Sequence, residues 1–518
     1  MDHATSPPSP SAPSVPARGL TAGWFMLACV AVVFGFQTRE RHLADRPLHA
    51  DEAVQAWQTW KLLKGDGYRY DPVDRHGPLL YYGSAAWHQL TAGTADNYSD
   101  ARARGFVLLA GFATLLLLGT AGGLPSLSPP VFITATALLA TETLSTLYHT
   151  YFVQEAWLAL FVWGFLLLLL SWRERDHNSV GWPVSLGLCA GLAQCTKETT
   201  PLYLVIAIGA VWVAQGKTIK LPGPRAIAAA AIGALLPYTL LYSGFGSNFE
   251  GLIDGVRTYG LQAERLSHSP HHYPWWHYLK TLGVLPTGGP NWGQYTLLAL
   301  AGIGGVLAFR RKAAAYHRAI AIFTVGTLLV HSVISYKTPW LLLTPVIGLV
   351  LLAAVTLVWL GQRSRWRLAL AIAIGLATCG ENLRRGHLAL DRYPGDARNP
   401  YFYQQTPRPF MRLVNRATQL QNVLDRPLTI AVVSEEHAWP LPWYWRDHDA
   451  TGYFETAPDN FAAWDMVVWD PQVGDAPPAL DSEYVAELHG LRPGVVLQVY
   501  IADPVWHRLF PPLGSDPS

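Results

Sequence analysis

Long apolar runs recur along the first 380 residues, and they constrain the fold more than any other feature of the sequence. A window of roughly 19 residues resolves about eleven such runs as candidate transmembrane helices. They cover residues 20–37, 102–120, 129–148, 154–172, 183–197, 200–215, 226–243, 295–309, 318–335, 339–360 and 367–380. Charged residues make up only 14% of the chain, whereas about 25% is usual in a soluble protein. We therefore predict an all-α polytopic membrane protein with about eleven transmembrane helices within residues 20–380.

The rest of the composition argues against several other classes of protein. A net charge of +2 gives no basis for nucleic-acid binding. The four cysteines lie inside apolar runs without metal-ligand spacing, so we interpret them as packing residues. Residues 1–19 are rich in Pro and Ser and are expected to form a disordered cytoplasmic N-terminus. No clear small-x-small cleavage site follows the run 20–37, which we interpret as an uncleaved first span.

Basic residues mark one side of the membrane. Four clusters end the even-numbered runs: Arg173 and Arg175; Lys217, Lys220 and Arg225; Arg310, Arg311 and Lys312; and Arg363, Arg365 and Arg367. The positive-inside rule assigns these clusters, together with Arg18, to the cytoplasm. The outer face then receives the loop 38–101, the loop 244–294 and everything after the last span. We expect a multi-pass protein integral to the plasma (inner) membrane.

The chain changes character at about residue 381, where apolar runs become short and Pro, Asp and Arg become frequent. LTIAVVS, DMVVWD and GVVLQVYIA predict buried strands, and PFMRLVNRATQLQNVL predicts an amphipathic helix. We predict a small extracytoplasmic α/β domain over residues 381–518. Its WPLPWYWRD segment has two explanations: the rings bind a sugar, or they pack this domain onto the membrane interface.

A pair of adjacent acids, Asp51 and Glu52, begins a tryptophan-rich segment of the first outer loop. Apolar residues at helical spacing and Gly65 at the end predict a helix here. In one reading Asp51 is the N-cap and Glu52 complements the helix dipole. In the other, the pair belongs to a functional site, because further ionisable residues fall at the same outer face: Arg75, His76, Glu155, Lys197, Glu198 and Lys337.

Each of these residues also has a structural explanation when it is considered alone. Lys337 can extend to lipid headgroups, and Lys197 can pair with Glu155 or Glu198. A charge in the membrane core costs about 2.5–3.5 kcal/mol on insertion scales, so such residues usually serve a pathway or a site. Their grouping on one face, without comparable acids on the other, favours a site.

Outward-facing carboxylates and cations beside lipid suit sugar transfer from a polyprenyl-phosphate donor. A carboxylate can act as general base toward an acceptor hydroxyl or amine, and cations can stabilise the leaving phosphate. The sequence has no P-loop and no dinucleotide-binding fingerprint, and this chemistry needs neither. Transport is the competing reading, but we find no internal repeat and the charges do not lie midway along the spans.

Several sequence blocks also resemble the GT-C membrane glycosyltransferases, which include protein O-mannosyltransferases and aminoarabinose transferases of lipid A. LHADEAVQAW, HGPLLYY and GLAQCTKETTPLY resemble the acidic pair, the Pro-Leu-aromatic segment and the Thr-Lys stretch of that superfamily. HADE, DPVDRHGPLLYY, TKET, SYKTPWL, NPYFYQQTP and WPLPWYWRD are similar to a subfamily known as flippase-activity-associated proteins of glycosylation loci. These blocks run from about residue 48 to 447.

The resemblance implies a polyprenyl-phosphate-linked sugar donor and inverting transfer to a lipid, glycan or protein acceptor on the outer face. It implies catalytic roles for Asp51 and Glu52, and substrate binding by Arg75, His76, Glu155, Lys197, Glu198 and Lys337. The aminoarabinose enzymes have an acid–Lys pair where this chain has Arg75–His76–Gly77–Pro78, so a divalent metal is left open. The subfamily also leaves open a non-catalytic accessory of lipid-linked sugar flipping.

Overall fold

The structure is a computed structural model that describes residues 22–73, 75–124, 126–172, 179–216, 222–268, 272–458, 460–476, 480 and 483–511. The segment predicted to be disordered, residues 1–19, lies outside these ranges, as does Arg18. So do four of the basic residues used to assign sidedness, Arg173, Arg175, Lys217 and Lys220.

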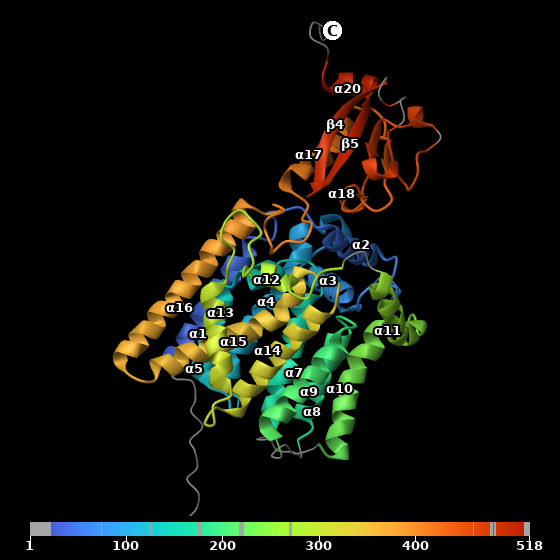
Figure 1. Cartoon of the computed structure of the whole chain (residues 1–518). Helices are drawn as coiled ribbons and strands as arrows, with labels where there is room; N and C mark the ends of the chain where they lie inside the picture. The colour runs from blue at the N-terminus through green and yellow to red at the C-terminus, as the bar shows by residue number, and fades with distance from the viewer. Residues whose placement is uncertain are drawn as a thin grey trace, which may run out of the picture.

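Helices occupy each of the eleven apolar runs. Their bounds are α1 (Ala22–Glu40), α4 (Asp100–Ala121), α5 (Pro129–Thr141) continued by α6 (Thr143–Tyr148), α7 (Glu155–Leu170), α8 (Gly181–Gln194), α9 (Thr200–Gln215), α10 (Pro224–Tyr242), α13 (Tyr295–Ala308), α14 (Ala315–Val333), α15 (Leu343–Gly361) and α16 (Arg365–Gly386). Figure 1 shows them packed side by side in one bundle. The chain is thus mostly helical, as predicted.

Four helical stretches in the described ranges are long and apolar enough to cross a membrane: Ala22–Glu40, Asp100–Ala121, Pro224–Tyr242 and Pro339–Gly361. Burial differs strongly among them. The most apolar window of Pro339–Gly361 is 89% buried, whereas those of Ala22–Glu40 and Pro224–Tyr242 are only 33% and 28% buried. The first therefore lies in the centre of the bundle. The other two expose apolar side chains such as Phe25 and Ile232, as a surface that contacts lipid requires.

Four further helices lie at the end of the bundle that faces the C-terminal sheet (Figure 1). They are α2 (Ala50–Lys64), α3 (Leu79–Leu90), α11 (Glu250–His268) and α12 (His277–Thr281). The predicted helix after the acidic pair is α2, and it ends as expected at Gly65, which adopts φ 94°. Its inner face buries Ala53 and Ala56 completely.

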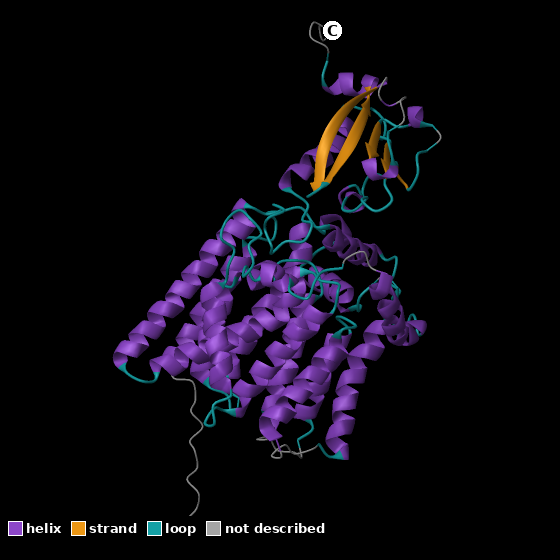
Figure 2. Cartoon of the chain, in the orientation of Figure 1, coloured by secondary structure: helices purple, strands orange, loops and turns teal. Residues whose placement is uncertain are grey.

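The C-terminal part contains a five-stranded mixed sheet in the order β2-β1-β3-β5-β4 (Figure 2). The strands are β1 (Ile430–Val433), β2 (Thr451–Phe454), β3 (Met466–Trp469), β4 (Tyr484–Arg492) and β5 (Val495–Ala502). β1 pairs in parallel with β2 and β3, and β5 pairs antiparallel to β3 and β4. The three predicted strands are β1, β3 and β5, and the predicted amphipathic helix contains α17 (Met411–Asn422).

Both faces of this sheet are covered, which explains why β1 and β3 are apolar without alternation. One face packs on α17 and α20 (Asp503–Leu509) through residues such as Leu413, Val432 and Val505. The other face forms a smaller cluster that includes Val433 and Trp469.

The predicted boundary at residue 380/381 lies inside a helix. α16 continues to Gly386 and is followed by a π-helical turn, His387–Arg392. The sequence ENLRRG is too polar to belong to an apolar run, so hydropathy alone ends the span early. The helix continues because Arg385, fully buried, donates hydrogen bonds to the carbonyl of Gly293 and to Asn382.

Candidate functional site

The first part of the candidate site is the N-terminus of α2. His49 is the N-cap: its Nδ1 accepts the backbone N–H of Asp51 at 3.1 Å, and Glu52 accepts the backbone N–H of His49 at 3.1 Å. This is a capping box. The reading of Asp51 as the N-cap is therefore wrong, because His49 already satisfies the helix end.

Glu52 has no exposed surface, and both of its oxygens are fully used. Arg104 of α4 donates to Oε1 and Oε2 at 2.8 Å each, and the backbone N–H of Phe152 adds a bond of 2.9 Å to Oε1. Burial alone would raise the pKa of Glu52, but Arg104 outweighs it and the pKa is lowered. Such a carboxylate is ionised and has no free lone pair directed at a ligand. Its arrangement is that of a residue that positions α2 against α4.

Asp51 has the opposite surroundings. Its side chain is 49% exposed, and one carboxylate oxygen lies 3.9 Å from Nδ1 of His49. The carboxylate is thus accessible, while the backbone that carries it is held by the capping box. Of the two predicted catalytic acids, only Asp51 is placed to accept a proton from a ligand.

The ring of His49 also belongs to a group of rings that we call the aromatic cluster. Its members are His49, Tyr148, Tyr151, Trp340 and Tyr403. Ring centroids within it are 5.4–6.2 Å apart. Because Nδ1 of His49 is an acceptor, its proton resides on Nε2, which is buried and has no hydrogen-bond partner among the described residues. Burial lowers the pKa of His49, so the ring is neutral.

The second part of the site is a row of charges formed by three segments. His76, on the loop between α2 and α3, contacts Glu198 at 3.0 Å through Nδ1. The neighbouring Lys197 donates to Glu155, the first residue of α7, at 2.5 Å. Burial alone would raise the pKa of Glu198, but the charge of His76 lowers it to about 2. Glu155 and Glu198 likewise raise the pKa of Lys197 against the effect of burial.

Gly77 explains how these segments approach so closely. A Cβ at this position would lie 2.2 Å from the carbonyl oxygen of Cys195, which accepts the N–H of Leu79 at 2.9 Å. Only glycine permits this approach. The DRHGPLL block is thereby fixed on the turn that carries Lys197 and Glu198.

The segment between His149 and Glu155 connects the two parts of the site. Its Phe152 binds Glu52, its Tyr151 belongs to the aromatic cluster, and its last residue, Glu155, binds Lys197. The acidic pair and the row of charges (His76, Glu198, Lys197 and Glu155) are therefore linked through residues 150–155. Oε2 of Glu155 is buried without a partner in the described chain, so the row retains one unused acceptor.

Two other predicted residues have different surroundings. Lys337 is 1% exposed, and its ammonium donates to the carbonyls of Ser332 and Ile334 at the C-terminus of α14. This is a helix-capping role. Arg75 lies beside His76, where its backbone N–H donates to the carbonyl of Asp71 at 3.1 Å and its charge acts on Tyr68.

The aromatic WPLPWYWRD segment packs against the bundle. Trp443 and Tyr444 donate to the two oxygens of Asp100 at 2.8 and 2.7 Å, and the hydroxyl of Tyr444 also accepts the N–H of Leu48. Trp443 is only 1% exposed. The sequence predicted either sugar binding or packing onto the membrane interface for this segment; the structure places Trp443 and Tyr444 against the helical bundle.

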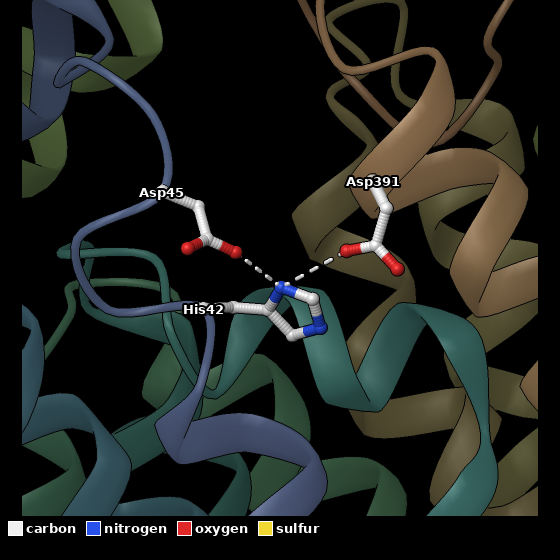
Figure 3. Close-up of side chains that lie close together, drawn as sticks. All are labelled: His42, Asp45 and Asp391. Carbon is white, nitrogen blue, oxygen red and sulfur yellow. Dashed lines mark hydrogen bonds and ion pairs between the residues drawn. The ribbon is translucent and has the colours of Figure 1, made fainter.

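A metal would need converging ligands, and His42, Asp45 and Asp391 are the set of three that the described residues bring within 4.8 Å of one another (Figure 3). His42 Nδ1 lies 2.8 Å from Asp45 and 3.6 Å from Asp391. Arg41 Nε donates to His42 Nε2 at 3.0 Å, so Nδ1 carries the ring proton. The three side chains therefore fit a hydrogen-bonded contact between two segments of the chain better than a metal site. None of them was a predicted site residue. His271 and His272, in the loop 244–294, are further candidates from the sequence for a metal ligand. His271 lies outside the described residues, and His272 is exposed and belongs to no group of three converging ligands in the described chain.

Sequence reasoning missed two residues of the site. His49 stands in the HADE block two positions before Asp51, and that proximity was a usable signal. Arg492, at the end of β4, acts electrostatically on Asp51 and Tyr403. Nothing in the local sequence HGLRPG indicates this, because the contact depends on where the sheet lies against the bundle.

No family model matches the chain, and no curated protein matches its sequence. The crystal structure of ArnT from Cupriavidus metallidurans in the apo state has a similar fold: 92% of this chain and 98% of that chain align with a TM-score of 0.60 and 15% identity. ArnT from the same organism bound to undecaprenyl phosphate aligns over 93% of this chain and 98% of that chain, with a TM-score of 0.58 and 13% identity. The S. cerevisiae protein O-mannosyltransferase Pmt1-Pmt2 complex bound to the sugar donor aligns over 46% of this chain and 35% of that chain, with a TM-score of 0.37 and 17% identity.

Over 92% of its length the chain therefore has an ArnT-like, mostly helical, membrane-protein-like fold with a small C-terminal mixed sheet.

Proposed function

We propose that this protein is a GT-C-type membrane glycosyltransferase that moves a sugar from a polyprenyl-phosphate donor to an acceptor, with inversion at the anomeric carbon. The observation that carries the proposal is the contrast within the acidic pair, in a fold like that of ArnT over nearly its whole length. Glu52 is buried and saturated, whereas Asp51 is half-exposed on a rigid helix start. A general base needs this combination of access and fixed position.

In the proposed reaction Asp51 takes the proton of an acceptor hydroxyl or amine. The acceptor atom attacks the anomeric carbon, and the bond from that carbon to the phosphate oxygen breaks. The electron pair of that bond leaves with the polyprenyl phosphate. A single displacement of this kind inverts the configuration. Glu52 and Arg104 act as positioning residues, because they hold α2 and hence Asp51 in place.

A polyprenyl-phosphate ligand is supported by ArnT bound to undecaprenyl phosphate. His76 and Lys197 are the sequence-predicted phosphate-binding cations that lie in the row of charges, and both already have carboxylate partners. In this proposal their main task is to hold the segments of the site together through ion pairs with Glu198 and Glu155, rather than to bind phosphate. Lys337 fixes the loop that supplies Trp340 to the aromatic cluster.

The same proposal places the site and the C-terminal sheet on the outer face and uses all eleven apolar helices as spans. The connectivity supports this orientation. α16 runs from the basic cluster at Arg363–Arg367 at one end to the part of the chain that leads to the sheet at the other (Figure 1). Positive charge at the end opposite the sheet is the distribution that cytoplasmic loops have.

The test is sugar transfer by purified protein in lipid nanodiscs, supplied with a panel of polyprenyl-phosphate sugars and acceptors. Wild type is compared with Asp51→Asn, whose side chain has the same shape but cannot accept the proton. We expect release of polyprenyl phosphate by wild type and a loss of about a hundredfold or more in the variant. Asp96→Asn, an exposed acid at the end of the same outer loop, is the matched control.

Equal release by wild type and Asp51→Asn would exclude Asp51 as the base. Absence of release from every donor and acceptor, by a folded wild-type protein that still binds polyprenyl phosphate, would favour the accessory role in lipid-linked sugar flipping.

A further inference from the structure

The turn between β4 and β5 reaches from the C-terminal sheet to the candidate site. Figure 1 shows β4 running down toward the helical bundle and β5 returning from it. Pro493 of this turn lines a cavity of about 160 Å³ together with Phe402, Gln404 and Gln405 of the NPYFYQQTP block. Tyr403, between two of these residues, places its ring 6.1 Å from that of His49. The turn therefore lies beside the segment that supplies Tyr403 to the aromatic cluster.

Arg492 immediately precedes Pro493 and is half-buried. Asp51, Tyr403, Asp470 and Glu436 all act on its charge. Yet its guanidinium forms no hydrogen bond and no ion pair within 4.0 Å with any other residue that the structure describes. A half-buried guanidinium loses part of its hydration, and without hydrogen-bond partners in the protein this loss is not compensated. An anionic ligand would supply the missing partners.

The other cations around the site are already engaged. Arg104 binds Glu52, Lys197 binds Glu155, His76 contacts Glu198, and Lys337 donates to backbone carbonyls. Arg46 donates to the carbonyls of His42 and Thr150. A phosphate would have to displace existing bonds to reach these groups, but not to reach Arg492.

The backbone beside the turn has a further unusual feature. Gln404 adopts φ 44°, a left-handed conformation that side chains other than glycine rarely take. Residues held in such conformations cluster at ligand-binding sites. It lies in the wall of the cavity that Pro493 also lines.

We infer that Arg492 is a substrate-binding residue that the C-terminal sheet contributes to the Asp51 site, where its guanidinium binds the phosphate of the polyprenyl-phosphate ligand. This inference rests on the proposed function. It gives the sheet a direct role, since the site would be incomplete without the β4–β5 turn. Arginine suits the task, because its planar fork binds phosphate oxygens in pairs.

Binding of undecaprenyl phosphate and of undecaprenol to the full chain in nanodiscs tests this inference. The proteins are wild type, Arg492→Gln, Arg492→Lys and, as a matched control, Arg508→Gln on α20. We expect Arg492→Gln to weaken binding of the phosphate by about tenfold or more and to leave binding of the alcohol unchanged. Arg492→Lys should restore part of the affinity, and Arg508→Gln should match wild type.

Wild-type binding that Arg492→Gln does not weaken would overturn the inference and leave the proposed function standing. An equal loss for phosphate and alcohol would also overturn it, since that pattern indicates a damaged fold rather than a lost charge contact. A folded wild type that does not distinguish the phosphate from the alcohol would contradict the proposed donor class itself. Thermal unfolding of each variant establishes that the sheet remains folded.

Discussion

Asp51 and Glu52 are neighbours in the chain, but their side chains have different surroundings and different tasks. Consecutive helical residues project about 100° apart, so two adjacent side chains cannot face the same surroundings. Glu52 points into the bundle and receives four hydrogen bonds, from Arg104, Phe152 and His49. Asp51 points away from Arg104 and stays accessible. The pair thus combines a fixed anchor with an exposed reactive group.

Replacing Glu52 with Gln should destabilise the protein rather than inactivate it selectively. Gln keeps the shape of the side chain but cannot compensate the buried charge of Arg104, and breaking a buried ion pair typically costs about 3–5 kcal/mol. We expect a clearly lower midpoint of thermal unfolding in nanodiscs, together with a loss of activity that follows the folded fraction. Asp51→Asn should show the reverse: near-normal stability and little activity.

Lys64→Gln provides the control for this comparison. It breaks the exposed ion pair of α2 with Asp96, which should contribute less than about 1 kcal/mol. If Glu52→Gln were no less stable than Lys64→Gln, the Glu52–Arg104 pair would not be the anchor of α2.

The residues of the site were only partly predictable from sequence, for a physical reason. Charges on an outer face identify candidates such as Asp51, Glu155 and Lys197, because charge near a membrane is costly without a purpose. Sequence alone does not say which partner each charge finds. Lys337 was expected to bind substrate, and the structure adds that its ammonium donates to carbonyls at the end of α14. Arg492 belongs to a strand far along the chain and was not considered.

At the scale of elements, the turn between α8 and α9 is fixed to the loop before α3. His76 and Glu198 form the polar contact, and Gly77 allows the backbones to touch. The pKa of Glu198 is lowered to about 2 in the folded protein, compared with about 4.3 in an unfolded chain. Its contribution to stability is therefore fully present above about pH 4.5 and is lost as the pH falls toward 2.

This linkage predicts a pH-dependent difference between wild type and Glu198→Gln. The variant cannot ionise, so it lacks the stabilisation of about 3 kcal/mol that the lowered pKa represents. Midpoints of thermal unfolding, measured from pH 6 to pH 3, should differ by a constant amount down to about pH 5. The gap should then narrow below about pH 4.5, because Glu198 becomes protonated in the unfolded wild type while it remains ionised in the folded protein. A gap that stayed constant to pH 3 would contradict the contact.

Elements were predictable where the hydrophobic pattern is strong. All eleven apolar runs contain helices, and the continuous apolar strands β1, β3 and β5 were recognised. β2 was missed because it lies at the edge of the sheet and is only partly buried, so it lacks the continuous apolar run of β1 and β3. β4, at the other edge, is mostly half-buried or exposed, so it lacks the apolar signal that a covered strand has.

At the scale of the whole molecule, the C-terminal sheet and the bundle meet through polar bonds close to the acidic pair. Asp100, the first residue of α4, accepts hydrogen bonds from Trp443 and Tyr444. Tyr444 in turn accepts the N–H of Leu48, one residue before His49. Gln405 donates to the carbonyl of Pro47. The start of α2 is thus held from the bundle side by Arg104 and from the sheet side by these contacts.

Weakening the contacts between the C-terminal sheet and the start of α2 should therefore reduce ligand binding at the site without unfolding the bundle. Asp100→Asn removes the charge that Trp443 and Tyr444 bind, at a cost of about 2 kcal/mol. We expect the backbone amides of residues 443–446 to exchange hydrogen about thirtyfold faster. We also expect a lower affinity for undecaprenyl phosphate, because the β4–β5 turn is held less firmly. Asp425→Asn, which changes an exposed acid just after the C-terminus of α17, is the control and should change neither. Unchanged exchange in Asp100→Asn would mean that other contacts hold the sheet in place. Faster exchange with unchanged affinity would show that the sheet does not contribute to binding the ligand. The phosphate would then be bound by residues of the bundle alone.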